Sequence, residues 1–425
     1  MQLSQFDIKR MVITSPRNNI SVDVSGIYEE LNIYDSVLFN TVSGNIFIVD
    51  AVGSLKGFDF DGSEFLTLDL TKEDNLFPYS GVFKIYSQGD KKSTSLASTR
   101  YRLNFVSVEY IESIKRKVVQ HYSDTYSNIT KRILKDFLNV PSRKLNGVIE
   151  NSQGIRSINI PTMAPLDAIT WCSKRALDTN KKPGFLFFEN NDGYNFTSIS
   201  NIFKQQPLGN INFSPKNVLD NFGSDFSGVN KYELIDQFDF VESVKSGVYA
   251  KKFRGYDIAR RTYTEITSNS LKDQSGITSA NKNKNETPFG TGLNNNVDAK
   301  VISYFYNSKP VGNEERPEDW LLQRESILRN LFAKKIRIEM PGKYTYTSGK
   351  LLNVLMPKFS VVTDNDKENG LDRSLYGNYL IIATRHMMTA KGRTHKTIMD
   401  LVTDSTNWDY NVTNTRIFWN RNSWR

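Results

Sequence analysis

Residues 377–405 read GNYLIIATRHMMTAKGRTHKTIMDLVTDS, and this stretch decides the fold. Apolar side chains in residues 379–384 have the period-two alternation of a strand, and residues 397–402 (TIMDLV) form a second such run. A polar turn that carries Lys391-Gly392 separates them. Two β-rich runs about a glycine-bearing turn predict a β-hairpin. By its residues alone this is an ordinary core hairpin, which completes a sheet and carries no chemistry.

The chain has 425 residues, too many for one ordinary core, so we expect several domains. Its 26 Phe and 20 Tyr favour β structure, because aromatic side chains suit half-buried pleated surfaces. No apolar run approaches about 18 residues, so no transmembrane helix is expected. The first residues, MQLSQFDIKR, lack the apolar core of a signal peptide. The single cysteine, Cys172, cannot form an intrachain disulfide, which predicts folding in a reducing cytoplasm.

The formal net charge is +9, but Lys and Arg are spread along the chain and mixed with acids. This pattern favours a solvated surface over a nucleic-acid site. Two basic runs stand out: residues 115–117 (KRK) follow a predicted strand, and residues 334–337 (KKIR) lead into one. No recognition helix or RNA-binding signature accompanies them. We therefore expect solvated strand edges, where lysine blocks unwanted strand pairing.

Residues 1–115 predict short strands separated by turns. Residues 46–50 alternate after a turn at Ser43-Gly44, and residues 65–70 form another run. GVFKIYS (81–87) and TRYRLNFVSVEYI (99–111) are two further predicted strands. Turn signals that recur between short strands indicate an antiparallel sandwich or barrel.

Residues 116–205 change to mixed α and β structure. Apolar spacing of three and four over residues 129–138 predicts a helix. A second helix is expected with Thr162 as its cap and Pro165 in its first turn. The stretch GFLFFENNDGYNFTSI (184–199) predicts a hairpin about its Asn-Asp-Gly turn.

Strand alternation returns in residues 206–260. Residues 265–300 are polar and rich in Asn, Ser, Lys, Gly and Thr, which is typical of a long loop. A helix with proline at its start is expected over residues 318–332. IRIEM (336–340) predicts a strand, and TYTSGKLLNVLMP (345–357) predicts a strand pair about its Ser-Gly turn.

Candidate catalytic and metal-binding residues are few. None of the three histidines, His121, His386 and His395, lies in a metal-ligand spacing such as HxH or HExxH. His386 and His395 flank the hairpin turn and are expected to face each other in a structural role, because two ligands do not close a tetrahedral shell. Cys172 lies beside Trp171 on an apolar helix face, which predicts an inert buried thiol.

Motifs for cofactor binding and for a catalytic serine are absent from the sequence, which contains no GxGxxG, no Walker loop and no GxSxG. The 46 acidic residues offer no pattern that would single out a carboxylate pair for glycoside hydrolysis. We therefore expect no enzyme activity, no bound cofactor and no bound metal.

Three patches of the sequence resemble a known family. Residues 31–51 contain LNIYDSV and GNIFIVDA, residues 161–196 contain PLDAITW and GFLFFENNDGYNF, and residues 376–405 contain GNYLI, a following histidine and LVTDS. These patches resemble the baseplate central hub proteins of contractile-tailed, T-even-like bacteriophages, and a weaker resemblance extends over residues 25–405. Asp35 stands where members often have Glu, which we interpret as neutral.

The resemblance implies a mainly β fold with α+β insertions, in which two tail-tube-like antiparallel β-barrel domains are joined to small α/β domains. The expected divisions are a first barrel (1–115), an inserted α/β domain (116–205), a second barrel (206–245 with 331–405), an insertion with a long polar loop and a helix (246–330), and an aromatic, basic C-terminal tail (406–425).

Members of that family form a trimeric ring in which two barrels per chain imitate six-fold symmetry. The resemblance thus implies a structural hub subunit that connects the hexameric tail tube to the trimeric cell-puncturing spike and lines the channel for genome delivery. The implied place is the tail baseplate of the virion, after assembly in the host cytoplasm. The implied partners are two further copies in a homotrimer, the spike (which can carry a lysozyme), tail-tube or tube-initiator proteins, baseplate wedge or tape-measure proteins, and DNA in transit, with no stable membrane insertion.

Other functions stay open. Within the same class, the chain could be a spike-fused hub or one from a type VI secretion system, but no OB-fold and β-helix continuation follows residue 405, which favours an unfused hub. The alternatives from another class are a tail-associated cell-wall hydrolase and a nucleic-acid-binding tail protein.

The tail after residue 405 contains three of the five tryptophans. Large aromatic side chains and arginine are the residue types that anchor interfaces. The candidate interface residues are Trp408, Tyr410, Arg416, Phe418, Trp419, Arg421, Trp424 and Arg425. These side chains either pack on their own subunit or dock on a neighbouring subunit or the spike, and we expect docking.

Overall fold

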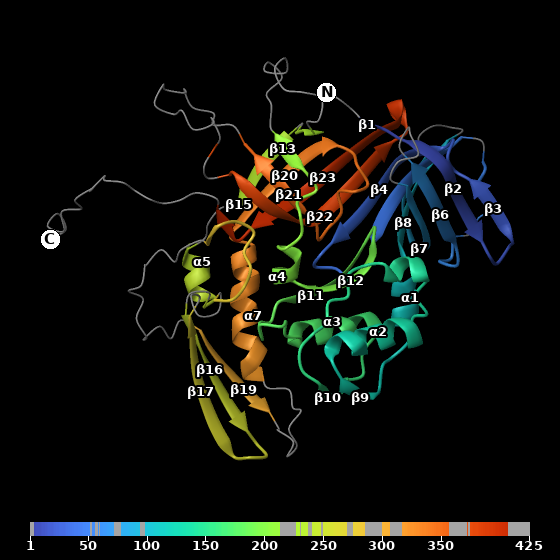
Figure 1. The fold of residues 1–425 in the computed structure, drawn as a ribbon. Helices are drawn as coiled ribbons and strands as arrows, with labels where there is room; N and C mark the ends of the chain where they lie inside the picture. Colours follow the sequence, from blue (N-terminus) through green and yellow to red (C-terminus); the bar gives the residue numbers. More distant parts are fainter. Residues whose placement is uncertain are drawn as a thin grey trace, which may run out of the picture.

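Strands dominate the fold, as Figure 1 shows, so the prediction of a mainly β protein is confirmed. The structure is a computed structural model that describes residues 4–51, 53–55, 58, 60–71, 78–93, 98–212, 227–229, 231–236, 240–247, 250–269, 275–284, 300–306, 317–356, 372 and 375–406. Among the helices of these residues, none is long and apolar enough to cross a membrane.

The largest element is a 15-stranded sheet. Its strands are β1 (Ser4–Gln5), β2 (Asp7–Ser15), β3 (Ile20–Asp23), β4 (Tyr28–Ser36), β5 (Ser43–Asp50), β6 (Phe65–Thr71), β7 (Tyr79–Ser93), β8 (Thr99–Ser107), β13 (Asn210–Asn212), β14 (Ser227–Gly228), β15 (Lys231–Asp236), β20 (Lys334–Pro341), β21 (Leu351–Leu355), β22 (Gly377–Thr389) and β23 (Thr394–Thr403).

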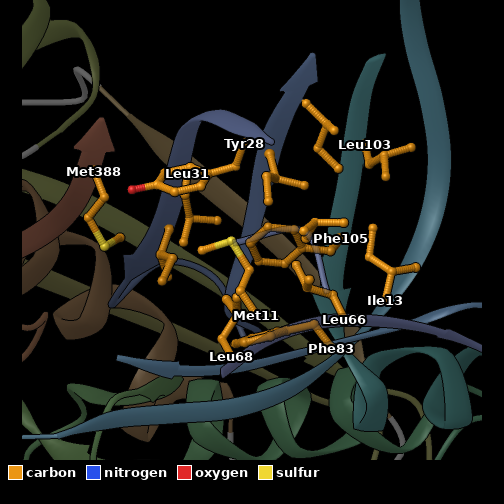
Figure 2. Close-up of a cluster of buried hydrophobic side chains, with 14 of the residues drawn as sticks. Met11, Ile13, Tyr28, Leu31, Leu66, Leu68, Phe83, Leu103, Phe105 and Met388 are labelled. Carbon is orange, nitrogen blue, oxygen red and sulfur yellow. The ribbon is translucent and has the colours of Figure 1, made fainter. Parts of the chain in front are cut away.

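One part of this sheet closes into a barrel. The strands follow in the order β2-β6-β7-β8-β5-β4-β22-β23, and β23 pairs with β1, which continues through Phe6 into β2. Alternate side chains of these strands point inward, because successive residues of a strand face opposite sides. Figure 2 shows part of the resulting core. Met11, Leu31, Phe105 and Met388 belong to this one cluster of buried side chains, and each has 0% exposure.

A second part of the same sheet also closes on itself. The strands β13, β21, β22, β23, β20 and β15 follow one another, and β14, which precedes β15 in the chain, pairs in parallel with β13. Its core contains Ile338, Val354, Ile381 and Leu401, also with 0% exposure. The prediction of two β-barrels is therefore confirmed, with the pairs of β13 parallel rather than antiparallel.

Both barrels contain the hairpin β22–β23, which we call the shared hairpin. The first half of β22 pairs with β21, from Leu380 opposite Leu351, and the second half pairs with β4, from Ala383 opposite Ser36. The other edge of β22 pairs with β23 from Leu380 to Thr389. A register shift between Ile381 and Ala383 marks the change of barrel, as a β-bulge re-aims a strand.

An α/β unit lies under the first barrel, and the insertion expected for residues 246–330 lies beside the α/β unit (Figure 1). The α/β unit consists of α1 (Val108–Ile114), β9 (His121–Asp124), α2 (Tyr126–Asp136), η1 (Ser142–Leu145), β10 (Arg156–Asn159), α3 (Pro165–Arg175), β11 (Phe185–Asn190), β12 (Gly193–Ser198) and α4 (Ile199–Ile202). The remaining elements are α5 (Phe240–Lys245), β16 (Ala250–Asp257), β17 (Thr262–Asn269), β18 (Asn283–Lys284), β19 (Val301–Tyr306), α7 (Pro317–Leu331), η3 (Lys391–Arg393) and β24 (Ser405–Thr406).

Several local predictions are confirmed. Helix α2 matches the predicted helix of residues 129–138 except that it begins at Tyr126 and ends at Asp136, and α7 matches that of residues 318–332 to within one residue at each end. The Asn-Asp-Gly turn joins β11 to β12, with Asn190 opposite Gly193. The hairpin of residues 377–405 is β22 and β23.

Two predicted helix and strand boundaries in the α/β unit are wrong. Thr162 does not cap α3, whose N-cap is Ala164, because the neighbouring Met163 pairs with Val118 in an extended bridge. The strand predicted for residues 99–111 ends at Ser107, and α1 follows, since the chain leaves the sheet there and the Glu109 carboxylate turns toward Lys144.

Three further predictions differ from the structure. Residues 240–245 form the helix α5 instead of a strand. The predicted polar loop begins inside β17, where Thr-rich TYTEITSN is a strand with one solvated face. Residues 345–350 are not a strand, because Thr347 and Ser348 bond to the Asp35 carboxylate instead of to a strand ladder.

Gly44 tests the packing of the first barrel. It lies in β5, not in the predicted turn, and a Cβ there would lie 2.3 Å from both the Asn32 carbonyl oxygen and the Phe105 ring. We predict that Gly44→Ala lowers the free energy of unfolding by about 2 kcal/mol, as overpacking does. Denaturant titration measures this change.

Gly89→Ala in β7 is the matched control, because nothing lies within 4 Å of a Cβ there. It should change the free energy of unfolding by less than about 0.5 kcal/mol. Equal effects of the two substitutions would contradict the packing of Figure 2.

Candidate functional site

The two barrels and the α/β unit meet at one polar contact region. We call it the junction and define it by Asp35, Val42, Glu189, Asn190, Thr347 and Ser348. The hairpin β11–β12 reaches it from the α/β unit, β4 from the first barrel, and the loop before β21 from the second barrel (Figure 1).

Asp35 ties the first barrel to the second. Its carboxylate accepts hydrogen bonds from the Ser348 backbone N–H at 2.8 Å and from the Thr347 hydroxyl at 3.0 Å. Burial raises the pKa of Asp35, and hydrogen bonds from Ser348, Thr384 and Thr347 oppose that rise. Asp35 is only 6% exposed, so these hydrogen-bond donors replace the water that its carboxylate loses on folding. Asp35 therefore connects the two barrels, and the interpretation of Asp in place of Glu as neutral stays a prediction.

Glu189 ties the α/β unit to the first barrel. One carboxylate oxygen accepts a hydrogen bond from the Val42 backbone N–H at 2.9 Å, and the other lies 2.7 Å from the Lys144 ammonium, which also contacts Glu109. Burial alone would lower the pKa of Lys144, but the charges of Glu189 and Glu109 raise it above its usual value. The ammonium therefore stays charged between two buried carboxylates.

Asn190 completes the junction, because its side-chain amide donates to the Ser348 carbonyl oxygen at 2.8 Å. The adjoining cavity, lined by Tyr79, Arg143 and Lys144 among others, has a volume of about 30 Å³. Such a space holds about one water molecule and no substrate. The junction thus connects the α/β unit and both barrels through buried hydrogen bonds.

A histidine pair lies inside the shared hairpin. His386 Nδ1 and His395 Nε2 are 3.1 Å apart, so one neutral ring donates to the other, and the prediction that the two face each other is confirmed. The Tyr344 ring stacks on His395 with centroids 4.6 Å apart. Burial lowers the pKa of His386 to about 4, although a hydrogen bond involving the Tyr346 backbone acts in the opposite direction.

A surface trio of residues has the order of a hydrolytic triad. On the β9–β10 pair, Ser157 Oγ lies 3.2 Å from His121 Nε2, and His121 Nδ1 lies 2.7 Å from Asn159 Oδ1. His121 is exposed and stands directly opposite Asn159 in the strand ladder, which accounts for the contact without a catalytic role. No sequence motif indicates this trio, because His121 is far from Ser157 and Asn159 in the chain.

Other predicted site residues have structural positions. Cys172 is buried with 0% exposure, as predicted. Within the described residues, no group of three or more His, Cys, Asp or Glu side chains could hold a metal ion. Lys115 and Arg116 pair with Glu112, and they follow a helix, α1, instead of the predicted strand. All eight candidate interface residues of the tail, 408–425, lie outside the described residues.

The comparisons with known proteins identify a fold. No family model and no curated protein matches the sequence. Among solved structures, the tail protein from Neisseria meningitidis MC58 is 11% identical with a TM-score of 0.55, over 94% of this chain and 97% of that one. The 43 kDa tail protein of prophage MuSo2 from Shewanella oneidensis is 10% identical with a TM-score of 0.49, over 93% of this chain and 98% of that one.

An E. coli component of the type VI secretion system, described as similar in structure to T4 bacteriophage tail proteins, is 9% identical with a TM-score of 0.45, over 96% of this chain and 78% of that one. At these identities the likeness concerns the fold, and of these three structures the Neisseria protein alone has a TM-score above 0.5. The chain therefore has a tail-protein fold over nearly its whole length.

The histidine pair makes stability depend on pH. Because the pKa of His386 is about 4 when folded and 6.5 when unfolded, the unfolded chain binds the proton first as pH falls. We predict that this group contributes about 3 kcal/mol at pH 7, all of it lost between pH 6.5 and 4. Denaturant titrations at pH 7, 6, 5 and 4 measure this loss.

His386→Gln keeps a polar side chain without the titration, so its unfolding free energy should fall less steeply over the same pH range. His121→Gln is the control, because it removes an exposed histidine outside the shared hairpin. If the unfolding free energy of both variants fell with pH as steeply as that of the original chain, another group would be responsible for the acid sensitivity.

Proposed function

We propose that this chain is a structural hub subunit of a contractile phage tail baseplate. Three copies form a pseudo-six-fold ring that connects the hexameric tail tube to the trimeric cell-puncturing spike and lines the channel for genome delivery. The observation that carries the proposal is the pair of closed β-barrels built on one shared hairpin, in a chain with a tail-protein fold.

Two barrels per chain suit a junction between six-fold and three-fold symmetry, since three chains then present six barrels to the tube. A ring of this kind needs a head-to-tail interface, in which different faces of one chain meet. The shared hairpin and Asp35 hold one barrel against the other, and Glu189 holds the α/β unit against the first barrel. A rigid angle within each chain supports closure of the ring after three copies.

The proposed role is not catalytic. The protein that supports the fold is a tail protein. His386 and His395 are hydrogen-bonded to each other, and Cys172 is buried on α3. The trio at His121 lies on an exposed strand pair, where water is not excluded from a reacting group. The place of action is the virion, with the spike, tube or tube-initiator proteins, and wedge or tape-measure proteins as partners.

Copy number tests the ring. We predict that the purified chain, alone or bound to its spike, assembles as three copies, with a hub mass three times the chain mass of 48.7 kDa. Light scattering measures the mass, and electron microscopy images the closed ring. Any other hub copy number in the spike complex would refute the trimeric hub.

The tail beyond the shared hairpin tests the interface. We propose that its aromatic and arginine side chains, residues 408–425, dock on a neighbouring subunit or on the spike. Deleting residues 411–425 should leave the melting temperature of the monomer unchanged but weaken trimer or spike association by about tenfold or more, since such residues dominate interfaces.

The matched control for the deletion replaces Asn411 and Asn414 by Ser, which keeps the length, the aromatic residues and the arginines. This variant should associate as the original chain does. Unfolding of the truncated chain, or its full assembly, would each rule out the docking role.

A further inference from the structure

The insertion presents a surface that the hub role does not use. Its three-stranded sheet has the order β17-β16-β19, in which β16 pairs antiparallel with β17 and in parallel with β19. Figure 1 shows this sheet projecting away from the barrels at the far end of α7. Among the described residues, β17 and β19 pair only with β16, so both edges of the sheet are free.

One face of the sheet is directed at α7. Along β16, Lys251, Phe253 and Asp257 are buried, and the Lys251 ammonium donates to the Ser326 hydroxyl of α7 at 3.0 Å. On the neighbouring strand, the Tyr306 hydroxyl contacts Glu318 of α7 at 3.5 Å. Because β-strand side chains alternate, the residues between these belong to the opposite face, which we call the outer face.

The outer face carries an exposed aromatic row. Tyr256 stands opposite Tyr263 of β17 and opposite Phe305 of β19, so all three belong to one face. Their exposed fractions are 38%, 59% and 72%, and Ile258 at the end of β16 is 57% exposed. Together these side chains expose about 400 Å² of mostly apolar surface, a size that marks interaction sites on soluble proteins.

Cations border this aromatic row. Lys252 and Arg254 lie on the same face and both contact Glu265, at 3.4 Å and 3.2 Å. Arg260 and Arg261 occupy the exposed turn between β16 and β17, where the Arg260 guanidinium lies 4.0 Å from the buried Asp257 carboxylate. Among the described residues of the outer face and its turn, Lys252, Arg254 and the two turn arginines thus outnumber the carboxylates of Glu265 and Asp257, so the border has a net positive charge.

We propose that the outer face docks another protein of the tail, one that presents an apolar patch bordered by carboxylates. This proposal rests on the proposed function for the presence of such a partner. Aromatic rings and arginine are the side chains that dominate protein interfaces, and carboxylates on the partner pair with Arg254 and the turn arginines.

A second copy of this chain fits the outer face poorly. The chain has a net charge of +9, and the same face of another copy would oppose cations to cations. Nucleic acid also fits poorly, because Glu265 lies among the cations and accepts from the Tyr263 hydroxyl at 2.7 Å. In addition, the Tyr256 and Phe305 rings meet edge-on at 66° and form no flat platform on which bases stack.

Photo-crosslinking in assembled tail particles tests the proposal. Phe305→benzoylphenylalanine places the probe on the outer face, and Tyr86→benzoylphenylalanine, at a 54% exposed position of β7, is the control. We expect the first probe to crosslink to a different protein, at a segment where Asp and Glu outnumber Lys and Arg, and the control to miss that segment. A crosslink to a second copy or to nucleic acid, or no crosslink, overturns the proposal.

Charge reversal provides a second measurement. Arg254→Glu should reduce the crosslink yield from position 305 about tenfold, because an arginine contact to an acidic partner becomes repulsive. Arg17→Glu, at an exposed position near the first barrel, should leave the yield unchanged. An equal effect of both, or no effect of Arg254→Glu, overturns the role of charge, and the melting temperature of each variant verifies folding.

The same experiment separates the two proposals. If the chain is missing from tail particles, the proposed function fails. If the chain is present in a ring and position 305 gives no crosslink to an acidic protein segment, only the docking surface fails.

Discussion

The shared hairpin is the constraint on which the rest of the structure depends. Each barrel needs β22 and β23 to close its ring of hydrogen bonds, so neither barrel is complete in a fragment that lacks residues 377–403. The bulge between Ile381 and Ala383 lets one strand change neighbours from β21 to β4. Since closed barrels leave few unpaired strand edges, this arrangement also removes sites of unwanted strand pairing.

Buried charge reinforces the geometry that the hairpin sets. Lys144, Glu109 and Glu189 all belong to the α/β unit, and the bond that crosses to the first barrel runs from the Val42 backbone N–H to the Glu189 carboxylate, which loses hydration when the unit docks. The same holds for Asp35, whose carboxylate needs both the Thr347 and the Ser348 donors. Such groups favour one relative orientation over its neighbours, because a small displacement leaves a buried charge without its partner. The junction therefore selects an orientation in addition to contributing stability.

The sequence predicted those parts of the fold that depend on local pattern. The strand alternation of residues 379–384, the Asn-Asp-Gly turn and the helix of α7 are set by neighbours in the chain, and each was predicted in the right place. Membership of one hairpin in two barrels was not predicted, because hydrogen-bonding partners such as Ser36 and Ile382, 346 residues apart, leave no periodic signal. Thr347 illustrates the difference: its β propensity predicts a strand, but its hydroxyl bonds to Asp35, and the tertiary contact decides.

The candidate sites show the same difference between contacts that are local in the sequence and contacts that are not. His386 and His395 lie across one hairpin, so spacing alone placed them face to face. Lys144 and Glu189 are brought together from separate elements, and no motif singles out one lysine or one glutamate among so many. The sequence did not predict the aromatic row of the outer face, because Tyr263 lies at the edge of a stretch dominated by polar residues.

The insertion is connected to the rest of the molecule through α7. The Arg324 guanidinium donates to the Phe185 carbonyl oxygen at 2.8 Å and to the Ser173 carbonyl oxygen at 3.2 Å, which ties α7 to β11 and α3. Burial lowers the pKa of Arg324 to about 10, so the cation persists at neutral pH and keeps both bonds. Helix α7 therefore contacts β11, and Glu189 and Asn190 at the end of β11 bond in turn to the first and the second barrel.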